Sequence, residues 1–534
     1  MSAARGLYRI AVTIVVAVSL AALGTIAIGD LSAGPLRSFE DQMCGLPREW
    51  LASTRRGYNE RRAGQIALLP RTPAYMSTGG QGWTHSGPWD YLQRVPLVLY
   101  GPGRIAEGVE VDDPATLADV APTFAHLLGQ EMLGEGRVLL DVAEPGRPPR
   151  LIVTVVWDGG GWNALRRYPD AWPNLAQIIA GGTTFTNARV GSSPSVTPAV
   201  HTTLGTGVFP ATHAITGVPV RNDAGVVVDS FFGNSGRGIE VSTFAEVWDE
   251  ANRNQPLVGM VGYEPWHLGM VGKGAEAPGG DHDHAVWINR ARNTWVTKRD
   301  YFALPAAFRD QSDLRERLDV LDRAEGEADR HWMRVPLDER NRIEETPAFI
   351  DHHEAKLEQM ISEEGYGADG VTDLLFTNFK HIDRLAHYFN MKAPEVRAVM
   401  ASTDGALGSL LEHLDSTIGH GRYVLVVTAD HGLQPNDSDV GGFAIDPNEV
   451  ERDIVAKFGP VVRSVWPTEV FLLQDELERR GLAIEDIARF LGDYRLRDNA
   501  TRIDEGIVGA GRFGPSDRVF EMAIPARMLH ETSC

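Results

Sequence analysis

The stretch "LIVTVVWDGGGW", residues 151–162, decides the fold class of this 534-residue chain. It is a continuous run of apolar and β-branched residues that ends in Asp158 and three glycines. A run without polar alternation is typical of a strand in a parallel sheet that is covered on both faces. Ligands bind at the carboxyl ends of such strands, so Asp158 is the first candidate for a functional residue.

Two later segments repeat this pattern. They are "VTDLLFTNF" (371–379) and "YVLVVTADHG" (423–432), and the stretch 394–415 between them has the apolar spacing of an amphipathic helix. Strand, helix and strand in this order predict a right-handed parallel crossover. We therefore expect an α/β fold with a central, mostly parallel sheet flanked by helices on both faces. The charged, less regular range 222–367 is expected to be an inserted cap over the sheet edge.

The composition excludes some classes of function. The formal net charge is −21, which argues against a general binder of nucleic acid or of anionic membranes. A local cationic or metal site could still hold an anionic substrate.

The N-terminus carries the uncharged run "IAVTIVVAVSLAALGTIAI" (10–28) behind Arg5 and Arg9. Its length is near the minimum for a membrane span and long for a signal peptide. Residues 1–29 are expected to be a signal anchor or a signal peptide, and the sequence does not separate the two. Either one predicts an extracytoplasmic protein, secreted or attached to the membrane.

Acidic and histidine side chains gather where the three predicted strands end. These residues are Asp158, Asp383, His387, Asp430 and His431. Each has an ordinary structural explanation, such as a strand-end turn or a hydrogen bond on a helix face. Together they indicate a metal site, and the mixture of carboxylate and imidazole suits zinc, with other divalent ions possible.

A hydroxyl group lies at a predicted helix start in "SSPSVTPAVHTTLG" (192–205). Pro198 favours the first helical position, which puts Thr197 at the N-cap, where anions bind. A hydroxyl there, next to a dication, can serve as a nucleophile. The alternative is a Thr that only caps the helix. Ser195 is the second candidate nucleophile.

These segments resemble the alkaline phosphatase superfamily, and its type I phosphodiesterase/nucleotide pyrophosphatase branch above all. The similarity rests on "VVWDGGGW", "TPAVHTTLGTGVFPATHAITG", "FKHIDRLAHYF" and "VVTADHGLQP", spread over residues 151–435. It implies an alkaline-phosphatase-like sandwich, two divalent metal ions, with Zn²⁺ expected, a Thr or Ser nucleophile and a covalent phospho-enzyme. Carried onto this chain, one ion would be surrounded by Asp158, Thr197, Asp430 and His431, and the other by Asp383, His387 and His85.

The order of segments departs from that family. The loop with the last metal histidine normally follows the "ADHG" strand, whereas here "STGGQGWTHSG" (77–87), with His85, precedes all the other motifs. The resemblance therefore implies a circular permutation. Residues 30–149 would complete the catalytic sheet, and 150–534 would form the catalytic domain. A permuted chain also predicts that Cys44 and Cys534 lie close together, as a disulfide or as two free thiols.

Four further sites carry weaker expectations. Asn222 and Lys273 are candidates for contacts to the phosphoryl group, by similarity alone. "DHDH" (281–284) is expected to be a solvated acidic loop, with an extra metal site as the alternative. His352 and His353 are expected at the surface.

The leading functional hypothesis is a metal-dependent hydrolase of phosphate esters, a phosphodiesterase or a phosphomonoesterase. A phospho-head-group transferase and a sulfatase-like hydrolase are alternatives, although "SVTPAVH" lacks the arginine of the sulfatase motif. The non-enzyme alternative is a membrane-tethered binding protein with an inactive copy of the fold. The expected partner is a phosphate-ester substrate, with no nucleic acid binding as such, and the oligomeric state is left open.

Overall fold

The computed structural model describes residues 38–78, 82–139, 148–324, 326, 328–338, 342–499 and 513–534. The chain divides into two compact units, Met1–Gln42 and Met43–Cys534, and the second unit carries all the features discussed below. The apolar run 10–28 lies outside the described residues. Among the helices of the described ranges, none is both long and apolar enough to cross a membrane.

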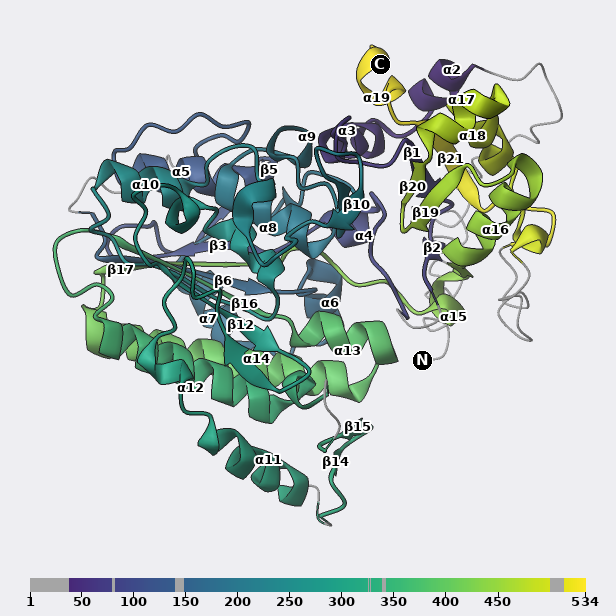
Figure 1. Ribbon diagram of the computed structural model, residues 1–534. Helices are drawn as coiled ribbons and strands as arrows, with labels where there is room; N and C mark the ends of the chain where they lie inside the picture. The colour runs from purple at the N-terminus through teal and green to yellow at the C-terminus, as the bar shows by residue number, and fades with distance from the viewer. Residues whose placement is uncertain are drawn as a thin grey trace, which may run out of the picture. The chain divides into compact units, whose positions relative to one another are not determined.

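A nine-stranded sheet is the centre of the second unit (Figure 1). In spatial order its strands are β13 (Thr294–Val296), β12 (His284–Asn289), β11 (Val258–Val261), β16 (Asp373–Phe379), β6 (Leu151–Trp157), β17 (Tyr423–Thr428), β3 (Leu97–Tyr100), β7 (Thr183–Phe185) and β4 (Val109–Val111). The run from β12 to β17 is parallel throughout. β3 is antiparallel to both of its neighbours. The predicted α/β class with a mostly parallel sheet is confirmed.

Helices cover both faces of this sheet, as Figure 1 shows. One face carries α7 (Pro173–Gly181), α12 (Pro347–Glu364), α13 (His381–Phe389) and α14 (Pro394–Leu414). The other carries α5 (Val120–Leu127), α8 (Thr197–Thr206) and α10 (Phe244–Ala251).

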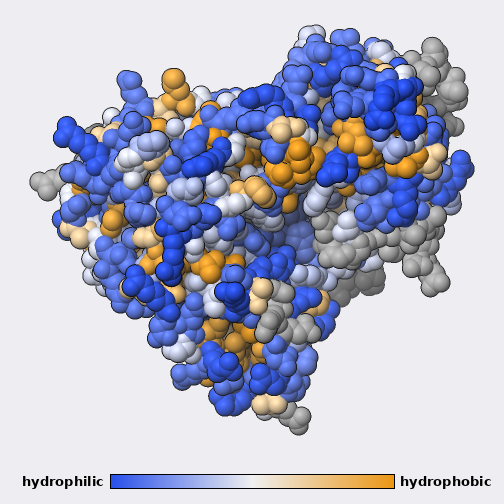
Figure 2. All heavy atoms as spheres, in the orientation of Figure 1, coloured by the Kyte–Doolittle hydropathy of each residue, from blue (hydrophilic) through white to orange (hydrophobic). Residues whose placement is uncertain are grey.

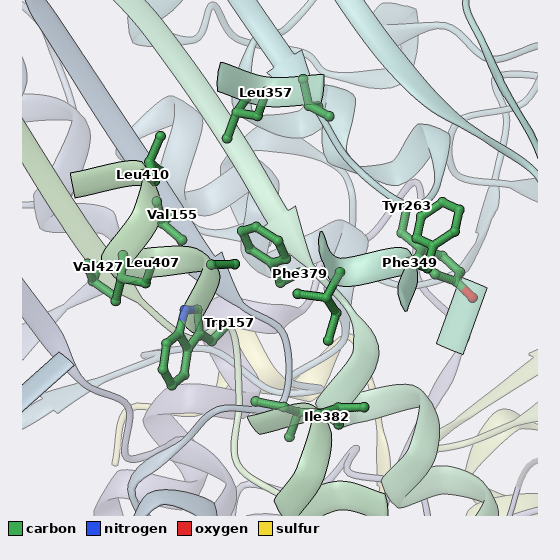
Figure 3. Packing of buried hydrophobic residues seen from close by; sticks show 14 of the residues in the cluster. Val155, Trp157, Tyr263, Phe349, Leu357, Phe379, Ile382, Leu407, Leu410 and Val427 are labelled. Atoms are coloured by element: carbon green, nitrogen blue, oxygen red, sulfur yellow. The ribbon is translucent and has the colours of Figure 1, made fainter. Parts of the chain in front are cut away.

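Successive residues of β6 supply the two cores on either side of the sheet. Val155 and Trp157 pack under α14, whereas Ile152 and Val156 face α5 and α8. Figure 3 shows the first core, where Val155 and Trp157 lie beside Leu407 of α14. Because both faces are buried, every side chain of this strand is buried, which explains its unbroken apolar sequence.

A second, four-stranded antiparallel sheet was not expected. Its order is β19 (Val462–Trp466), β20 (Glu469–Leu472), β1 (Ile66–Pro70) and β21 (Phe520–Pro525), with α16 (Pro447–Phe458) and α18 (Ile484–Gly492) packed on it. Residues 30–149 are therefore shared between two sheets, because β1 joins this one whereas β3 and β4 join the main sheet. The C-terminal part of 150–534 supplies the other three strands, β19, β20 and β21, of this four-stranded sheet.

The two cysteines form a disulfide, which is one of the two outcomes that the sequence left open. Cys44 and Cys534 are bonded, with their Cα atoms 5.6 Å apart. Arg55 of α3 (Arg48–Gly57) holds the same region by donating to the carbonyl oxygens of Leu529 and Thr532, each at 2.7 Å.

Two expectations for the middle of the chain need correction. The range 222–367 is not only a cap, because it contributes β11, β12 and β13 to the main sheet. His352 and His353 are buried, not at the surface. His353 stacks on Phe379 and lies 3.1 Å from the Thr377 hydroxyl, because this side of α12 faces the sheet.

The outer surface agrees with the strongly acidic composition. Polar and charged side chains cover most of the face in Figure 2, and the apolar side chains on it form small separate groups. No broad apolar surface is visible on this face, which is typical of a chain that keeps its apolar area in its cores.

Candidate active site

The residues that follow β6, β16 and β17 meet at one edge of the main sheet, because these strands are parallel and end together. Asp158 follows Trp157, and α13 begins two residues after Phe379. Trp157, Phe379 and Ile382 lie in the buried core beneath this edge (Figure 3). The polar side chains therefore stand on a rigid, close-packed base.

A first group of ligand atoms consists of His85, Asp383 and His387. Asp383 Oδ1 lies 3.3 Å from His85 Nε2 and 3.2 Å from His387 Nε2. His85 Nδ1 lies 2.8 Å from the carbonyl oxygen of Ser195. A carbonyl only accepts, so Nδ1 carries the proton in the neutral ring and the lone pair of Nε2 faces Asp383. The expected approach of His85 to Asp383 and His387 is confirmed.

A second group surrounds His431. Its Nε2 lies 3.4 Å from Asp158 Oδ1, 3.4 Å from Asp430 Oδ2 and 3.9 Å from Asp383 Oδ1. His431 Nδ1 lies 3.1 Å from the Gly432 carbonyl oxygen, which again leaves the Nε2 lone pair facing carboxylates. The rings of His85 and His431 stack with their centroids 3.5 Å apart, so the first and second groups of ligand atoms are adjacent.

The atoms that face one another have the chemistry of a metal site. Over the described part of the chain, Asp158 Oδ1, Asp383 Oδ1, Asp430 Oδ2 and His431 Nε2 are buried without a hydrogen-bond partner. Buried polar atoms are seldom left in this state. Ligands of a tetrahedral zinc at 2.0–2.1 Å lie about 3.3 Å apart, close to the separations found here. The residues therefore fit divalent cations.

Lys380 is a central residue that the sequence analysis missed. Its Nζ lies 2.9 Å from Asp158 Oδ2, 3.0 Å from Asp383 Oδ2 and 3.0 Å from Thr197 Oγ1. It therefore connects the two acidic groups with the hydroxyl. Its place directly after the β16 strand, three residues before Asp383, was the available signal.

Burial and charge shift the pKa values of this cluster in opposite directions. Burial alone would raise the pKa of Asp158, but the Lys380 ammonium outweighs it and holds that pKa below its ordinary value. Burial and the neighbouring Asp158 raise the pKa of Asp430. Burial would lower the pKa of His431, yet Asp430 and Asp158 raise it to about 9. Without a bound cation the His431 ring is therefore protonated near neutral pH, and a metal ion would replace that proton at Nε2. The Lys380 ammonium and one imidazolium still do not balance three buried carboxylates, so the cluster attracts further positive charge.

Thr197 lies at the start of α8, one residue further into the helix than expected. Val196 is the N-cap and Thr197 is the first helical residue. His201, one turn on, has its Nδ1 2.8 Å from the Thr197 carbonyl oxygen and its Nε2 3.2 Å from Asn378 Nδ2. Both ring nitrogens of His201 are engaged in these bonds, so it braces the helix start and is a weak candidate for a metal ligand.

Ser195 has a different role from Thr197 in this arrangement. Its hydroxyl donates to the His85 carbonyl oxygen at 2.8 Å. Ser195 and His85 thus bind each other through two hydrogen bonds. This pairing fixes the orientation of the His85 ring, which favours Thr197 over Ser195 as the nucleophile.

The two predicted phosphoryl contacts lie elsewhere. Asn222 Oδ1 accepts from the backbone N–H groups of Ala224 and Val226, so it stabilises its own turn between β9 (Pro219–Arg221) and β10 (Val227–Asp229). Lys273 donates to the Ile239 carbonyl oxygen and lines a separate cavity. Their predicted role is not supported, because the motif similarity did not fix the path of this part of the chain.

A cavity of about 310 Å³ opens onto the cluster. Thr197, Lys380, Asp383, His85 and His387 lie at its base. Its remaining lining includes Trp266, Arg384, Tyr388 and Trp466. Trp466 belongs to β19, so the unexpected four-stranded sheet supplies part of the wall.

The model of the family described as type I phosphodiesterase / nucleotide pyrophosphatase matches residues 152–494. Alkaline phosphatase PafA of Elizabethkingia meningoseptica is 25% identical over 135 residues, which are 23% of this chain and 25% of that protein. A protein of Myroides odoratus named calcium-transporting ATPase is 23% identical over 407 residues, which are 64% of this chain and 72% of that protein.

A crystal structure of PafA is also similar to this structure. The TM-score is 0.52 at 18% sequence identity, over 65% of this chain and 76% of that one. This likeness shows the alkaline-phosphatase-like fold. The sequence match to PafA spans only a quarter of PafA's length.

Proposed function

Because the chain belongs to the type I phosphodiesterase / nucleotide pyrophosphatase family, a family of phosphoric ester hydrolases, we propose that it hydrolyses phosphate esters with Thr197 as the nucleophile. The observation that carries the proposal is the contact of the Thr197 hydroxyl with the Lys380 ammonium, which Asp158 and Asp383 also bind. It joins a helix-terminal hydroxyl to the two groups of carboxylate and imidazole side chains.

Two divalent cations fit the cluster, and zinc suits its donors. Asp158, Asp430 and His431, whose two carboxylates each have an oxygen 3.4 Å from His431 Nε2, would hold one. His85, Asp383 and His387 would hold the other. Bound there, the cations would supply positive charge to the attacking and leaving oxygens of an in-line displacement.

The attacking oxygen is the hydroxyl oxygen of Thr197, and Lys380 stabilises it. The Thr197 Oγ–phosphorus bond forms while the ester oxygen leaves and takes up a proton, so the products of the first step are an alcohol and phosphothreonine. Lys380 stabilises the negative charge that develops on Oγ as its proton leaves. The positive end of the ten-residue helix α8 attracts the phosphoryl oxygens. Water then hydrolyses the phosphothreonine and regenerates Thr197.

The cavity supports a substrate whose leaving group is larger than a small alcohol. Its volume is about 310 Å³, and Trp266 and Trp466 contribute flat apolar surface to its wall. Arg384 lines the same cavity. Phosphate monoesters and diesters both fit this cavity. Turnover of p-nitrophenyl phosphate and of its bis ester distinguishes between them.

An extracytoplasmic location and a permuted chain order remain predictions. The Cys44–Cys534 disulfide supports export, because disulfides persist in oxidising compartments. His85, which precedes the family match at 152–494, lies in the same cluster as Asp383 and His387, as a permutation requires.

The test combines metal analysis with turnover. The purified full chain is expected to contain divalent metal and to hydrolyse p-nitrophenyl phosphate, its bis ester, or both. Chelation should abolish turnover, and zinc should restore it. Hydrolysis that persists after complete removal of metal would refute the metal-dependent mechanism, and lack of turnover of both esters by zinc-loaded protein would refute the proposed activity.

A further inference from the structure

A second acidic cluster lies at the opposite edge of the main sheet from the candidate active site. It consists of Asp249, Asp281 and Asp283. Asp249 is in the last turn of α10, and Asp283 directly precedes β12. β11 and β12 run parallel to β16, so their amino ends are remote from the carboxyl ends that carry Asp158 and Asp383. This cluster is therefore independent of the catalytic one.

The carboxylates converge on one point. One oxygen from each residue lies within 4.8 Å of the others. Asp249 is 6% exposed, and in the described ranges its Oδ1 has no hydrogen-bond partner. Asp281 Oδ1 is likewise buried without a partner among the described residues. A buried carboxylate oxygen aimed at two other carboxylates requires either a proton or a cation between them.

Nearby basic side chains are engaged elsewhere. The charged neighbours that act on Asp249 and Asp283 are other carboxylates, Asp281 above all. Lys273 donates to the Ile239 carbonyl oxygen, and Arg237 Nε lies 3.2 Å from Glu276 Oε2.

The two histidines of the "DHDH" stretch do not complete the cluster as ligands. His284 Nδ1 lies 2.9 Å from the Tyr366 hydroxyl, and its Nε2 lies 3.7 Å from Glu364. His282 is exposed. The donors that converge are therefore oxygen atoms alone.

We propose that Asp249, Asp281 and Asp283 bind one Ca²⁺ ion at the amino ends of β11 and β12. Calcium takes oxygen ligands at 2.3–2.6 Å, so two ligands of one ion lie at most about 5 Å apart, and the three carboxylate oxygens, all within 4.8 Å of one another, satisfy this limit. Mg²⁺ requires a tighter octahedron, and Zn²⁺ favours nitrogen or sulfur donors.

Asp249 also lines a cavity of about 390 Å³, together with Glu246, Glu250 and Asn254. These neighbours add negative charge and an amide oxygen on the Asp249 side of the cluster. Water in the cavity can complete the coordination shell of a calcium ion, which takes 6–8 oxygen ligands. The ion would join the end of α10 to the loop before β12 and so stabilise this side of the sheet.

The test is calcium titration of the zinc-loaded full chain, freed of calcium with EGTA and followed by isothermal titration calorimetry. We expect one calcium site in the wild type. Asp281→Asn and Asp283→Asn should each weaken it at least about tenfold, whereas Asp223→Asn at an exposed position should not. His387→Ala should keep the calcium site, because His387 belongs to the other cluster. Asp281→Asn should also leave ester hydrolysis unchanged.

Thermal unfolding gives a second readout. Free calcium at 100 times its Kd should raise the ratio of folded to unfolded protein about 100-fold in the wild type and not in Asp281→Asn. Burial and Asp281 raise the pKa of Asp249 to about 7, so a shared proton is the competing explanation. Absence of calcium binding in the wild type, equal binding in Asp281→Asn, or tighter binding of Mg²⁺ than of Ca²⁺ would each overturn the proposal.

Discussion

Replacing Lys380 by Met tests the connection between the hydroxyl and the acidic groups. The change keeps the length of the side chain and removes its charge at a position that is 4% exposed. It deletes three contacts of 2.9–3.0 Å, to Asp158, Asp383 and Thr197. Removing one partner of a buried ion pair costs about 3–5 kcal/mol, so the metal-free variant should unfold far more easily than metal-free wild type.

The same substitution should slow catalysis. A positive donor 3.0 Å from the attacking oxygen stabilises the charge that develops there, and loss of such a group lowers kcat by about 10²–10³-fold. The assay is p-nitrophenyl ester turnover of zinc-loaded protein, with metal content measured in parallel. Lys392→Met is the matched control, because Lys392 pairs with Asp439 at a partly exposed position.

Metal loading separates the structural effect of Lys380 from its catalytic effect. Bound cations compensate Asp158 and Asp383, so the loss of stability should be smaller in zinc-loaded protein than in metal-free protein. The reasoning is refuted if zinc-loaded Lys380→Met retains the wild-type kcat, or if both forms lose the same stability.

Three further predictions concern pH, positioning and the disulfide. Burial raises the pKa of Glu469 from 4.5 to about 8, so the folded state binds this proton more tightly than the unfolded state, and stability falls as the pH rises through this window, by up to about 4–5 kcal/mol; Glu469→Gln should therefore have a higher Tm than wild type near pH 9 and an equal Tm at about pH 4, below the unfolded pKa, and equal Tm values at both would contradict this. Ser195→Ala removes the hydroxyl bond to the His85 carbonyl oxygen but keeps the backbone carbonyl that binds His85 Nδ1, so zinc affinity should fall by less than the about 10–100-fold typical of losing a partner that orients a ligand, measured by competition with a zinc chelator. Phosphorylation of Thr197 should persist in this variant, and its loss would make Ser195 the nucleophile. Cys44→Ser should lower stability by up to about 6 kcal/mol on the chain-entropy estimate, since the bond joins residues 490 apart, and an unchanged Tm would show that local contacts alone hold the two ends.

The sequence predicted those parts of the fold that depend on continuous burial. β6, β16 and β17 are apolar along their whole length because helices cover both faces of the sheet, and the acidic and histidine residues follow at their ends. The family resemblance then supplied His85, whose loop lies far away in the chain order. Residue spacing alone would not have joined it to Asp383.

The remaining features depend on tertiary contacts that the sequence does not display. In the sequence, nothing distinguishes Lys380 from an ordinary basic residue. Only the fold places it between the carboxylates of Asp158 and Asp383. β1 joins β20 and β21, which lie about 400 and about 450 residues later, and pairing over such distances leaves no local pattern. Asn222 and Lys273 were chosen by motif similarity alone, and their side chains bind nearby backbone groups, Asn222 in its own turn and Lys273 at Ile239.

Trapping the covalent intermediate tests the central claim most directly. Zinc-loaded protein would be mixed with p-nitrophenyl phosphate, quenched in acid during turnover, digested and analysed by mass spectrometry. The account predicts one phosphoryl group on Thr197, present in wild type and absent from Thr197→Ala, which should keep its metal but lose turnover. A phosphoryl group on Ser195, or turnover without any phosphorylated peptide, would contradict it.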